Sequence, residues 1–253
     1  MKSKPLTLII LTGNSHDLFE KSLTSCTFAD EIILISNATD NTHQVAKSIY
    51  PNIKIYQSPQ PFNFSTARNL GLKHATGKWI LYIDSDEVVT PSLKKQILEI
   101  IDHPSKYTNY DLPRANYFLG HRVRYGGTYP DYVKRLFLRR HLIKYVGILH
   151  EQPQVTGPSG VLNSNLLHYT HRHLQSMLSK SIDWTQIEAQ LLHQAHHPPV
   201  VWWRFIRMLF TKLWQRLVLE SMWRDGIVGW ISLIFEVYDT YMIYAYLYEL
   251  QHA

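Results

Sequence analysis

Three acidic side chains, Asp84, Asp86 and Glu87, follow directly after an apolar stretch that runs from Trp79 to Ile83. Two carboxylates separated by one residue can face the same cation, and hard divalent cations such as Mg²⁺ and Mn²⁺ take oxygen ligands. A cation held by few carboxylates usually completes its shell with substrate phosphates. The Asp84–Asp86 pair therefore predicts a site for a cation and a diphosphate. The alternative is that these acids are solvated loop charges or helix caps.

The elements that must position these acids can be read from the first hundred residues. Short apolar runs occupy 6–12, 31–36, 53–57 and 79–84, and helix-like segments lie between and after them at about 16–26, 41–50, 65–75 and 91–101. Alternating strands and helices predict βαβ units and a mostly parallel sheet. Asp40 and Thr90 are predicted to cap the helices that follow them, and Pro91 suits a first helical position.

Polar residues that follow three of these strands are expected to meet in one cleft. Right-handed crossovers place the strand ends on one edge, and ligands bind outside the carboxyl ends of such strands. The residues concerned are Thr12, Asn14, Ser36, Asn37, Asp84, Ser85 and Asp86.

Composition narrows the class of protein. The chain has 253 residues, of which 45% are hydrophobic and 18% are charged, and this balance is typical of a globular protein. Its one cysteine, Cys26, allows no internal disulfide and favours a reducing compartment. The basic, apolar N-terminus is interpreted as a buried strand and not as an export signal. The net charge of +6 is compatible with nucleic acid, a membrane surface or anionic substrates.

The segment "FSTARNLGLKHATGKWILYIDSDE" resembles the glycosyltransferases of family 2, which have the GT-A fold. The resemblance rests on Ala-Arg-Asn-x-Gly at 67–71, Ala-x-Gly at 75–77 and a strand that ends in Asp-x-Asp. A later segment, "GGTYPDYVKRLFLRRHLIKYVGILHEQPQVTG", is similar to the bacterial subgroup that includes lipopolysaccharide core glucosyltransferases. The implied fold is α/β: a Rossmann-like, mostly parallel sheet flanked by helices.

The resemblance implies an inverting transfer of a sugar from a nucleotide-diphosphate donor, a UDP-sugar before others, to an acceptor hydroxyl. It implies a divalent cation, Mg²⁺ or Mn²⁺, with Asp86 as the first candidate ligand and Asp84 and His150 as further candidates. Asp84 and Ser85 are also expected at the nucleotide sugar. The base of the nucleotide is expected near Thr12, Asn14, Ser36 and Asn37. Arg68 either pairs with a phosphate or the base pocket, or forms a structural bridge to Asp84.

The general base is expected in the later region, where Asp131 and Glu151 compete and both remain open. Acceptor contacts are predicted for Tyr129, Arg135 and Arg172. Arg135 also belongs to a group of arginines that either binds phosphates or forms a solvated basic face. That group comprises Arg122, Arg124, Arg135, Arg139 and Arg140.

The last third of the chain reads as helical from about residue 168. We expect a glycosyltransferase domain at 1–165, with a nucleotide-sugar half at about 1–100 and an acceptor half at about 101–165, and a helical extension at 166–253. Residues 200–224 form a basic amphipathic helix with tryptophans, a type that lies in a membrane interface. Residues 226–251 are nearly long enough to span a bilayer, but Glu236 and Asp239 favour a docked or interfacial helix.

These features together favour a glycosyltransferase bound peripherally to the cytoplasmic face of the inner membrane, acting on a lipid-linked or lipopolysaccharide-type glycan. No nucleic-acid motif appears. A nucleotidyltransferase would show a glycine-rich basic loop after the first strand, which "LTGNSHD" lacks. The other alternative is a non-catalytic nucleotide-binding or scaffold protein. The Ser36-Asn37 turn supports this alternative, because in the family the strand predicted here at 31–36 usually ends in Asp.

Overall fold

The computed structural model describes residues 5–14, 17–58, 63–148, 151–170 and 172–253. The chain forms two compact units. The first contains the residues up to 114 together with 132–168, and the second contains 115–131 together with 169–253. The segment 115–131 therefore groups with the C-terminal helices. The boundary after residue 165 stays a prediction.

The predicted mostly parallel sheet is confirmed. Four parallel strands stand in the order β3-β2-β1-β4, and β8 then pairs antiparallel with β4. These strands are β1 (Leu6–Thr12), β2 (Glu31–Ser36), β3 (Lys54–Gln57), β4 (Trp79–Asp84) and β8 (Asp131–Leu138). The same sheet continues through β6 (Asn109–Phe118), β12 (Leu166–Tyr169) and β5 (Glu87–Val89). Shorter strands are β7 (His121–Arg122), β9 (Leu142–Val146), β10 (Gln152–Val155) and β11 (Ser159–Val161).

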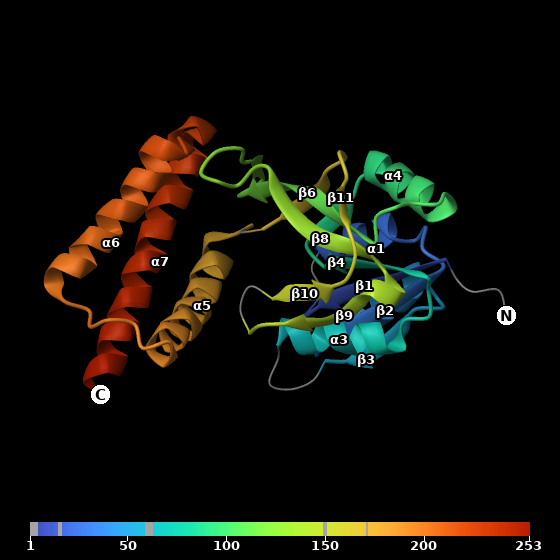
Figure 1. Ribbon diagram of the computed structural model, residues 1–253, viewed down its shortest axis with the longest axis horizontal. Coiled ribbons are helices and arrows are strands. Elements are labelled where there is room, and N and C mark those ends of the chain that lie inside the picture. Colours follow the sequence, from blue (N-terminus) through green and yellow to red (C-terminus); the bar gives the residue numbers. More distant parts are fainter. Residues whose placement is uncertain (1–4, 15–16, 59–62, 149–150, 171) are drawn as a thin grey trace. The chain divides into compact units, whose positions relative to one another are not determined.

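Helices cover both faces of the parallel strands (Figure 1). They are α1 (Asp17–Ser25), α2 (Thr42–Ile49), α3 (Phe64–His74) and α4 (Pro91–Asp102). Side chains of β1 alternate between two cores: Leu8 and Ile10 pack with residues of α1, α2 and α4, while Ile9 and Leu11 pack with α3. Because both faces of β1 and β4 are buried, these two strands are mostly apolar, as expected for the centre of a parallel sheet, whereas the edge strand β3 is exposed at both ends.

The predicted helix caps have different outcomes. Thr90 is the N-cap of α4, its hydroxyl accepts a hydrogen bond from the Leu93 amide, and Pro91 follows at the first position. For α2 the prediction is one residue off, because the N-cap position belongs to Asn41. Asp40 nevertheless accepts a hydrogen bond from the Thr42 amide, so its carboxylate still satisfies one of the helix's first N–H groups.

The second unit is mostly helical. It contains α5 (Leu174–Gln194), α6 (Trp202–Trp214) and α7 (Gly226–His252). Between α6 and α7 lie a π-helical turn at Gln215–Leu219 and a 3₁₀ turn at Met222–Asp225. The expectation of helix from residue 168 is wrong at its start, because 166–169 form β12. One stretch, Met222–His252, is long and apolar enough to cross a membrane by length and composition, with a mean hydropathy of 1.2.

Candidate active site

The carboxyl edge of the parallel strands brings the predicted polar residues of three loops together. Thr12 and Ser36 are paired residues at the ends of β1 and β2, and the Asn37 amide donates to the Thr12 carbonyl at 3.3 Å. The Asn14 side chain accepts a hydrogen bond from the Thr39 amide at 2.9 Å and so ties the first loop to the second. Ser85 joins the same edge, because its amide donates to the Leu11 carbonyl.

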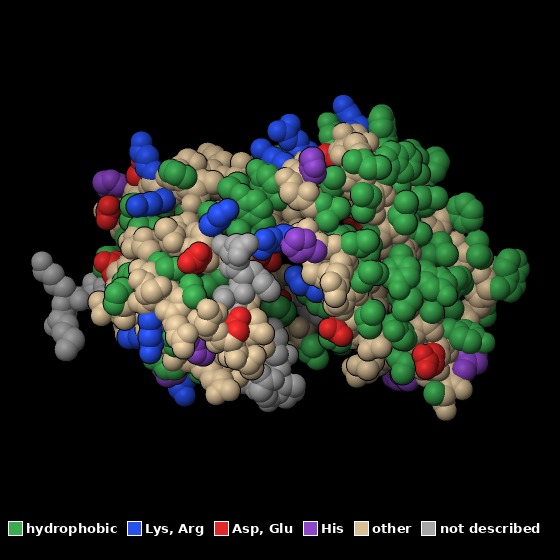
Figure 2. Space-filling model, turned by 180° about the vertical axis from the view of Figure 1, so that it is seen from behind, with side chains coloured by type: hydrophobic (Ala, Val, Ile, Leu, Met, Phe, Trp, Pro, Cys, Tyr) green, Lys and Arg blue, Asp and Glu red, His purple; other side chains and the backbone are tan. Residues whose placement is uncertain are grey.

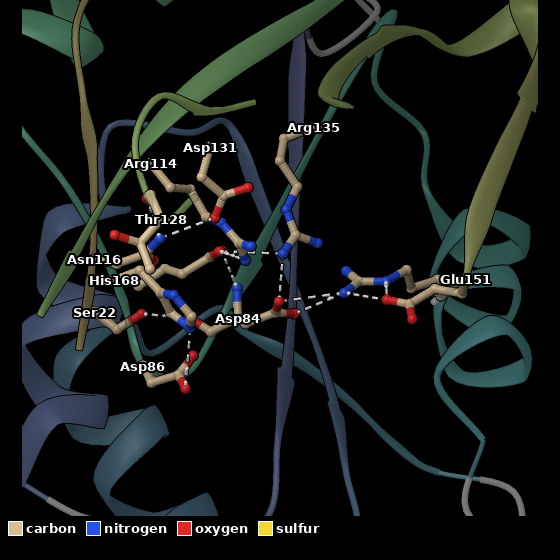
Figure 3. A network of polar contacts seen from close by, with 12 residues as sticks. Ser22, Asp84, Asp86, Arg114, Asn116, Thr128, Asp131, Arg135, Glu151 and His168 are labelled. Atoms are coloured by element: carbon tan, nitrogen blue, oxygen red, sulfur yellow. Dashed lines mark hydrogen bonds and ion pairs between the residues drawn. The ribbon is translucent and has the colours of Figure 1, made fainter. Parts of the chain in front are cut away.

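The three acids at the end of β4 and just after it have three different environments, and Figure 3 shows two of them, Asp84 and Asp86. Glu87 is fully buried: one of its carboxylate oxygens accepts the Asp84 amide at 2.9 Å, and the other accepts Arg135 at 3.1 Å. Arg114 lies 3.5 Å from that second oxygen. Glu87 therefore fixes the turn that carries the other two acids, a role that its position in the sequence did not indicate.

Asp84 is held between two arginines. Arg68 donates to both of its oxygens, at 3.0 and 3.2 Å, and Arg135 donates to one of them. Burial by itself would raise the pKa of Asp84, but the charges of Arg135 and Arg68 outweigh it and hold the pKa well below its usual range. The carboxylate therefore remains ionised at any physiological pH.

Asp86 faces His168. The His168 Nε2 lies 3.6 Å from an Asp86 oxygen, and both side chains are partly exposed, at 16% and 32%. His168 belongs to β12, where it stands opposite Glu87 of β5 in the sheet register. His168 was not predicted as a site residue, because the sequence was expected to be helical from about residue 168. The only local signal was the density of histidines.

Asp86 and His168 fit a cation that shares its shell with a substrate. A carboxylate oxygen and an imidazole nitrogen are both ligands that Mn²⁺ accepts, whereas Mg²⁺ prefers oxygen alone. Within the described part of the chain, no group of three or more His, Cys, Asp and Glu side chains could hold a metal ion. Donor phosphates would have to complete the shell. His150, also predicted as a ligand, lies outside the described residues.

The Ala-Arg-Asn-x-Gly motif has a structural reason at each of its last three fixed positions. Asn69 forms two hydrogen bonds with the Tyr145 backbone, at 2.9 and 2.7 Å, and so attaches α3 to β9. Gly71 lets α3 approach the sheet, because a Cβ there would lie 2.5 Å from Cγ2 of Ile9. Arg68, 1% exposed, reaches the acids at the strand end. The motif thus holds α3, the sheet and the acidic turn in one arrangement.

Arg68 forms the predicted bridge to Asp84, while its contact with a phosphate or the base pocket stays a prediction. Its guanidinium joins Asp84 to Glu151, donating to one Glu151 oxygen from Nε at 3.1 Å and from Nη2 at 3.0 Å. Glu151 is therefore engaged by a buried cation at the same edge of the sheet. The planar fork of arginine suits such a bridge, and lysine could not make it.

The predicted arginine group does not form one cluster. Arg135 is 6% exposed and occupied by Asp84 and Glu87, so the structure gives it a bridging position and not the open one that acceptor contact requires. Arg139 and Arg140 lie at the end of the sheet where β4 begins. The Arg139 amide donates a hydrogen bond there to the Lys78 carbonyl. They line a shallow cavity of about 450 Å³ there, remote from the acids.

The remaining candidates belong to the second unit. The Asn116 side-chain amide donates to the Asp131 carboxylate and to the Thr128 carbonyl, each at 3.0 Å. Tyr129 is 37% exposed, and the Arg122 guanidinium lies over its ring at 5.2 Å. Arg172 is half-buried. Asn116 was not predicted, and nothing in its immediate sequence marks it.

A mostly parallel α/β sheet with polar and charged side chains at the carboxyl ends of its strands places the chain among the open α/β proteins, which bind ligands at that edge. Residues 7–158 match the family described as glycosyl transferase family 2, which is more than half of the chain. The chain belongs to this family, and the predicted GT-A type of fold is confirmed with it.

The chain is also similar to two curated proteins and to one solved structure. The chain is 28% identical over 153 residues to the SPbeta prophage-derived glycosyltransferase SunS of Bacillus subtilis (strain 168), covering 58% of this chain and 34% of SunS. It thus spans about a third of the length of that relative. It is 23% identical over 262 residues to the lipopolysaccharide core biosynthesis glycosyltransferase LpsC of Rhizobium meliloti (strain 1021), covering 98% of this chain and 93% of LpsC. The mannosyltransferase PcManGT from Pyrobaculum calidifontis, in complex with GDP-Man and Mn²⁺, superposes with a TM-score of 0.48 at 12% identity, covering 98% of this chain and 86% of that one.

Proposed function

We propose that this protein is a cation-dependent, inverting glycosyltransferase that moves a sugar from a nucleotide-diphosphate sugar to a hydroxyl of a glycan acceptor. The observation that carries the proposal is the difference in environment among Asp84, Asp86 and Glu87. Asp84 and Glu87 are neutralised by buried arginines, whereas Asp86 is partly exposed and faces His168. We assign Asp86 and His168, which face each other and are partly exposed, to hold a cation against the diphosphate of the donor.

The donor half of the site is proposed at the carboxyl edge. Thr12, Asn14, Ser36 and Asn37 line the ends of β1 and β2 and are assigned to the nucleotide base, while Asp84 and Ser85 are assigned to the ribose. A cation bound there would stabilise the leaving diphosphate as charge develops on it. Asp84 stays anionic because of Arg68 and Arg135, so it can accept hydrogen bonds from ribose hydroxyls. UDP-sugars remain the first donors to test.

Asp131 is proposed as the general base. An inverting displacement needs a carboxylate that removes the proton of the attacking hydroxyl. Glu151 is the competitor, but one of its oxygens already accepts two hydrogen bonds from the buried Arg68 guanidinium. Asp131 stands at the start of β8 and accepts a hydrogen bond from the Asn116 side-chain amide. Tyr129 and Arg172 are proposed to contact the acceptor.

The acceptor is proposed to be a lipid-linked or lipopolysaccharide-type glycan, reached at the cytoplasmic face of the inner membrane. Two observations support this choice. LpsC, whose name places it in lipopolysaccharide core biosynthesis, matches nearly the whole chain. In addition, α6 and α7 expose large apolar side chains that suit a peripheral membrane contact.

One feature favours a second candidate function, a nucleotide-binding protein without transfer activity. The end of β2 carries Ser36 and Asn37 where the family usually has an aspartate. Ser36 is buried, and its hydroxyl accepts the Ala38 amide at 3.0 Å, so it shapes the turn. A base contact there would fall to Asn37, whose neutral amide binds differently from a carboxylate.

The test compares the wild-type protein with Asp86→Asn and with Asp102→Asn, an exposed aspartate at the end of α4. Nucleotide diphosphates and nucleotide sugars are added with and without Mn²⁺. A ligand present at 100 times its Kd raises the unfolding free energy by about 2.7 kcal/mol. We expect a Mn²⁺-dependent rise in Tm with one nucleotide, lost in Asp86→Asn alone, and sugar transfer that falls about 100-fold or more. Binding without transfer would favour the second candidate, and binding without any effect of Asp86→Asn would remove the cation site.

A further inference from the structure

A second set of polar contacts lies within the second unit. The turn between α6 and α7, residues 215–226, holds the loop 119–130 that leads into Asp131. The Asp225 carboxylate accepts hydrogen bonds from the backbone amides of Arg124, at 3.0 and 3.1 Å, and of Tyr125, at 2.9 Å. The Asp225 carboxylate thus binds the backbone of the loop.

Further along the loop, Gly126 is bound through both of its backbone groups. Its amide donates to the Glu220 carbonyl at 3.0 Å, and its carbonyl accepts Nη1 of Arg216 at 2.6 Å. The same arginine pairs with the carboxylates of Glu220 and Glu236, which fix its orientation. Arg216 lies in the π-helical turn, and such turns are frequent at functional sites.

The glycines of the loop fit this contact closely. Gly126 and Gly127 have φ of +70° and +72°, a conformation that favours glycine. A Cβ at Gly126 would lie 2.7 Å from the Met222 side chain, and one at Gly127 would lie 3.0 Å from Arg216. The loop therefore lies against the turn with no room for a side chain between them.

The far end of the loop reaches the proposed base. Asn116 of β6 donates to the Thr128 carbonyl and to the Asp131 carboxylate. The Thr128 hydroxyl in turn donates to the Tyr125 carbonyl at 2.7 Å. A continuous chain of hydrogen bonds thus runs from Asp225, through the loop backbone, to Asp131.

We infer that the α6–α7 turn is a clamp that sets the position of Tyr129 and Asp131, with Asp225 and Arg216 as positioning residues for transfer to the acceptor. The inference rests on the proposed function for its kinetic consequence, but the clamp itself is a property of the fold. It assigns to the C-terminal helices a part in the reaction besides any membrane contact. Misplacing a reacting group by about 1 Å can cost about 100-fold in rate.

The first measurement is hydrogen exchange on the full chain, for wild type, Asp225→Ala, Asp225→Asn and the control Asp183→Asn, an exposed aspartate on α5. Peptides that cover 119–131 should exchange faster in Asp225→Ala and less so in Asp225→Asn, because asparagine keeps one acceptor oxygen. Peptides of the parallel strands and of Asp183→Asn should match wild type. Unchanged exchange of 119–131 in Asp225→Ala would overturn the clamp.

The second measurement separates positioning from general destabilisation. With UDP-glucose, Mn²⁺ and a deacylated lipopolysaccharide core oligosaccharide, we expect kcat/KM for the acceptor to fall about 10- to 100-fold in Asp225→Ala. The Mn²⁺-dependent thermal shift by UDP should stay as in wild type. Faster exchange with unchanged acceptor kinetics would overturn the positioning role. A wild-type protein that transfers no sugar from any donor would overturn the proposed function instead, while exchange still decides the clamp.

Discussion

Single residues in this protein show how neighbouring acids acquire different properties. Glu87 and Asp84 are separated from Asp86 by at most two positions, yet buried arginines neutralise the first two. An uncompensated buried charge costs several kcal/mol, so these acids and arginines form one unit in which each charge offsets another. Replacing Arg135 would leave Asp84 with Arg68 alone and Glu87 with the more distant Arg114. Its position is therefore better explained by the acids than by an acceptor.

Glu31 gives a residue-scale prediction about pH. It is buried, and burial alone would raise its pKa, but hydrogen bonds from Lys54, Thr7 and Thr76 outweigh burial and lower the pKa from 4.5 to about 2. A carboxylate with a lowered folded-state pKa stabilises the fold above about pH 4.5, and that stability is lost as the pH falls toward 2. Glu31→Gln should lower the unfolding free energy at pH 7 by about 1–3 kcal/mol.

Urea unfolding between pH 7 and pH 3 checks this prediction. The difference between wild type and Glu31→Gln should shrink as the pH falls through this range, because protonation removes the advantage of the carboxylate. Glu99→Gln, an exposed position on α4, is the matched control and should follow wild type. A difference that stays constant with pH would contradict the role given to the Glu31 charge.

At the scale of elements, the packing of α3 on the sheet rests on one glycine. Alanine at Gly71 would favour the helix by about 1 kcal/mol, but its Cβ would lie 2.5 Å from Ile9. We expect the cost of overpacking to exceed the gain in helix propensity, so that the unfolding free energy falls by about 1–3 kcal/mol. Gly13→Ala, where the nearest atom is 3.4 Å away, should cost less.

A double-mutant cycle tests the cause of this loss. If the Ile9 side chain is what the new methyl group meets, Gly71→Ala should cost less in an Ile9→Ala background than in wild type. Denaturant unfolding of the four proteins gives the interaction free energy. Additive effects would show that the strain arises elsewhere in α3.

Sequence patterns predicted the first hundred residues well because each element there follows from local information. The apolar runs, the Thr90 cap and the order of strands and helices match the structure closely. The site beyond residue 100 was less accessible. His168 meets Asp86 only through the pairing of β12 with β5, and Asn116 meets Asp131 across a loop. Such contacts join positions that no periodicity or spacing connects, so tertiary packing decides them.

At the scale of the whole molecule, apolar side chains gather over the C-terminal helices (Figure 2). The outward face of α6 carries Trp202, 81% exposed, Phe210 and Trp214, and α7 adds Ile227 and Ile234. Two acidic residues of α7, Glu236 and Asp239, contact neighbouring helical segments instead. Glu236 pairs with Arg216 and Lys212, and Asp239 accepts a hydrogen bond from Ser181. The two helices thus expose apolar surface, which suits contact with a membrane interface.

This arrangement predicts binding to anionic vesicles through α6. Burying a large apolar side chain contributes about 1.5–3 kcal/mol, so the double change Trp202→Ser and Trp214→Ser should lower the vesicle partition coefficient about 100-fold or more. Ile143→Ser, at an exposed position of β9 in the first unit, should leave it unchanged. Neutral vesicles and high salt should weaken binding, because the net charge of +6 is attracted to anionic lipid over about a Debye length.

Co-sedimentation with vesicles and the tryptophan emission maximum measure this binding directly. A blue shift on anionic vesicles that disappears in the double variant is the expected result. If wild type and the double variant bind equally, α6 is not the contact. If neither binds but the double variant lowers the oligomeric state in sedimentation, then the same face joins two copies of the chain. The apolar surface would then be an interface between proteins, and the acceptor would have to reach the site from solution.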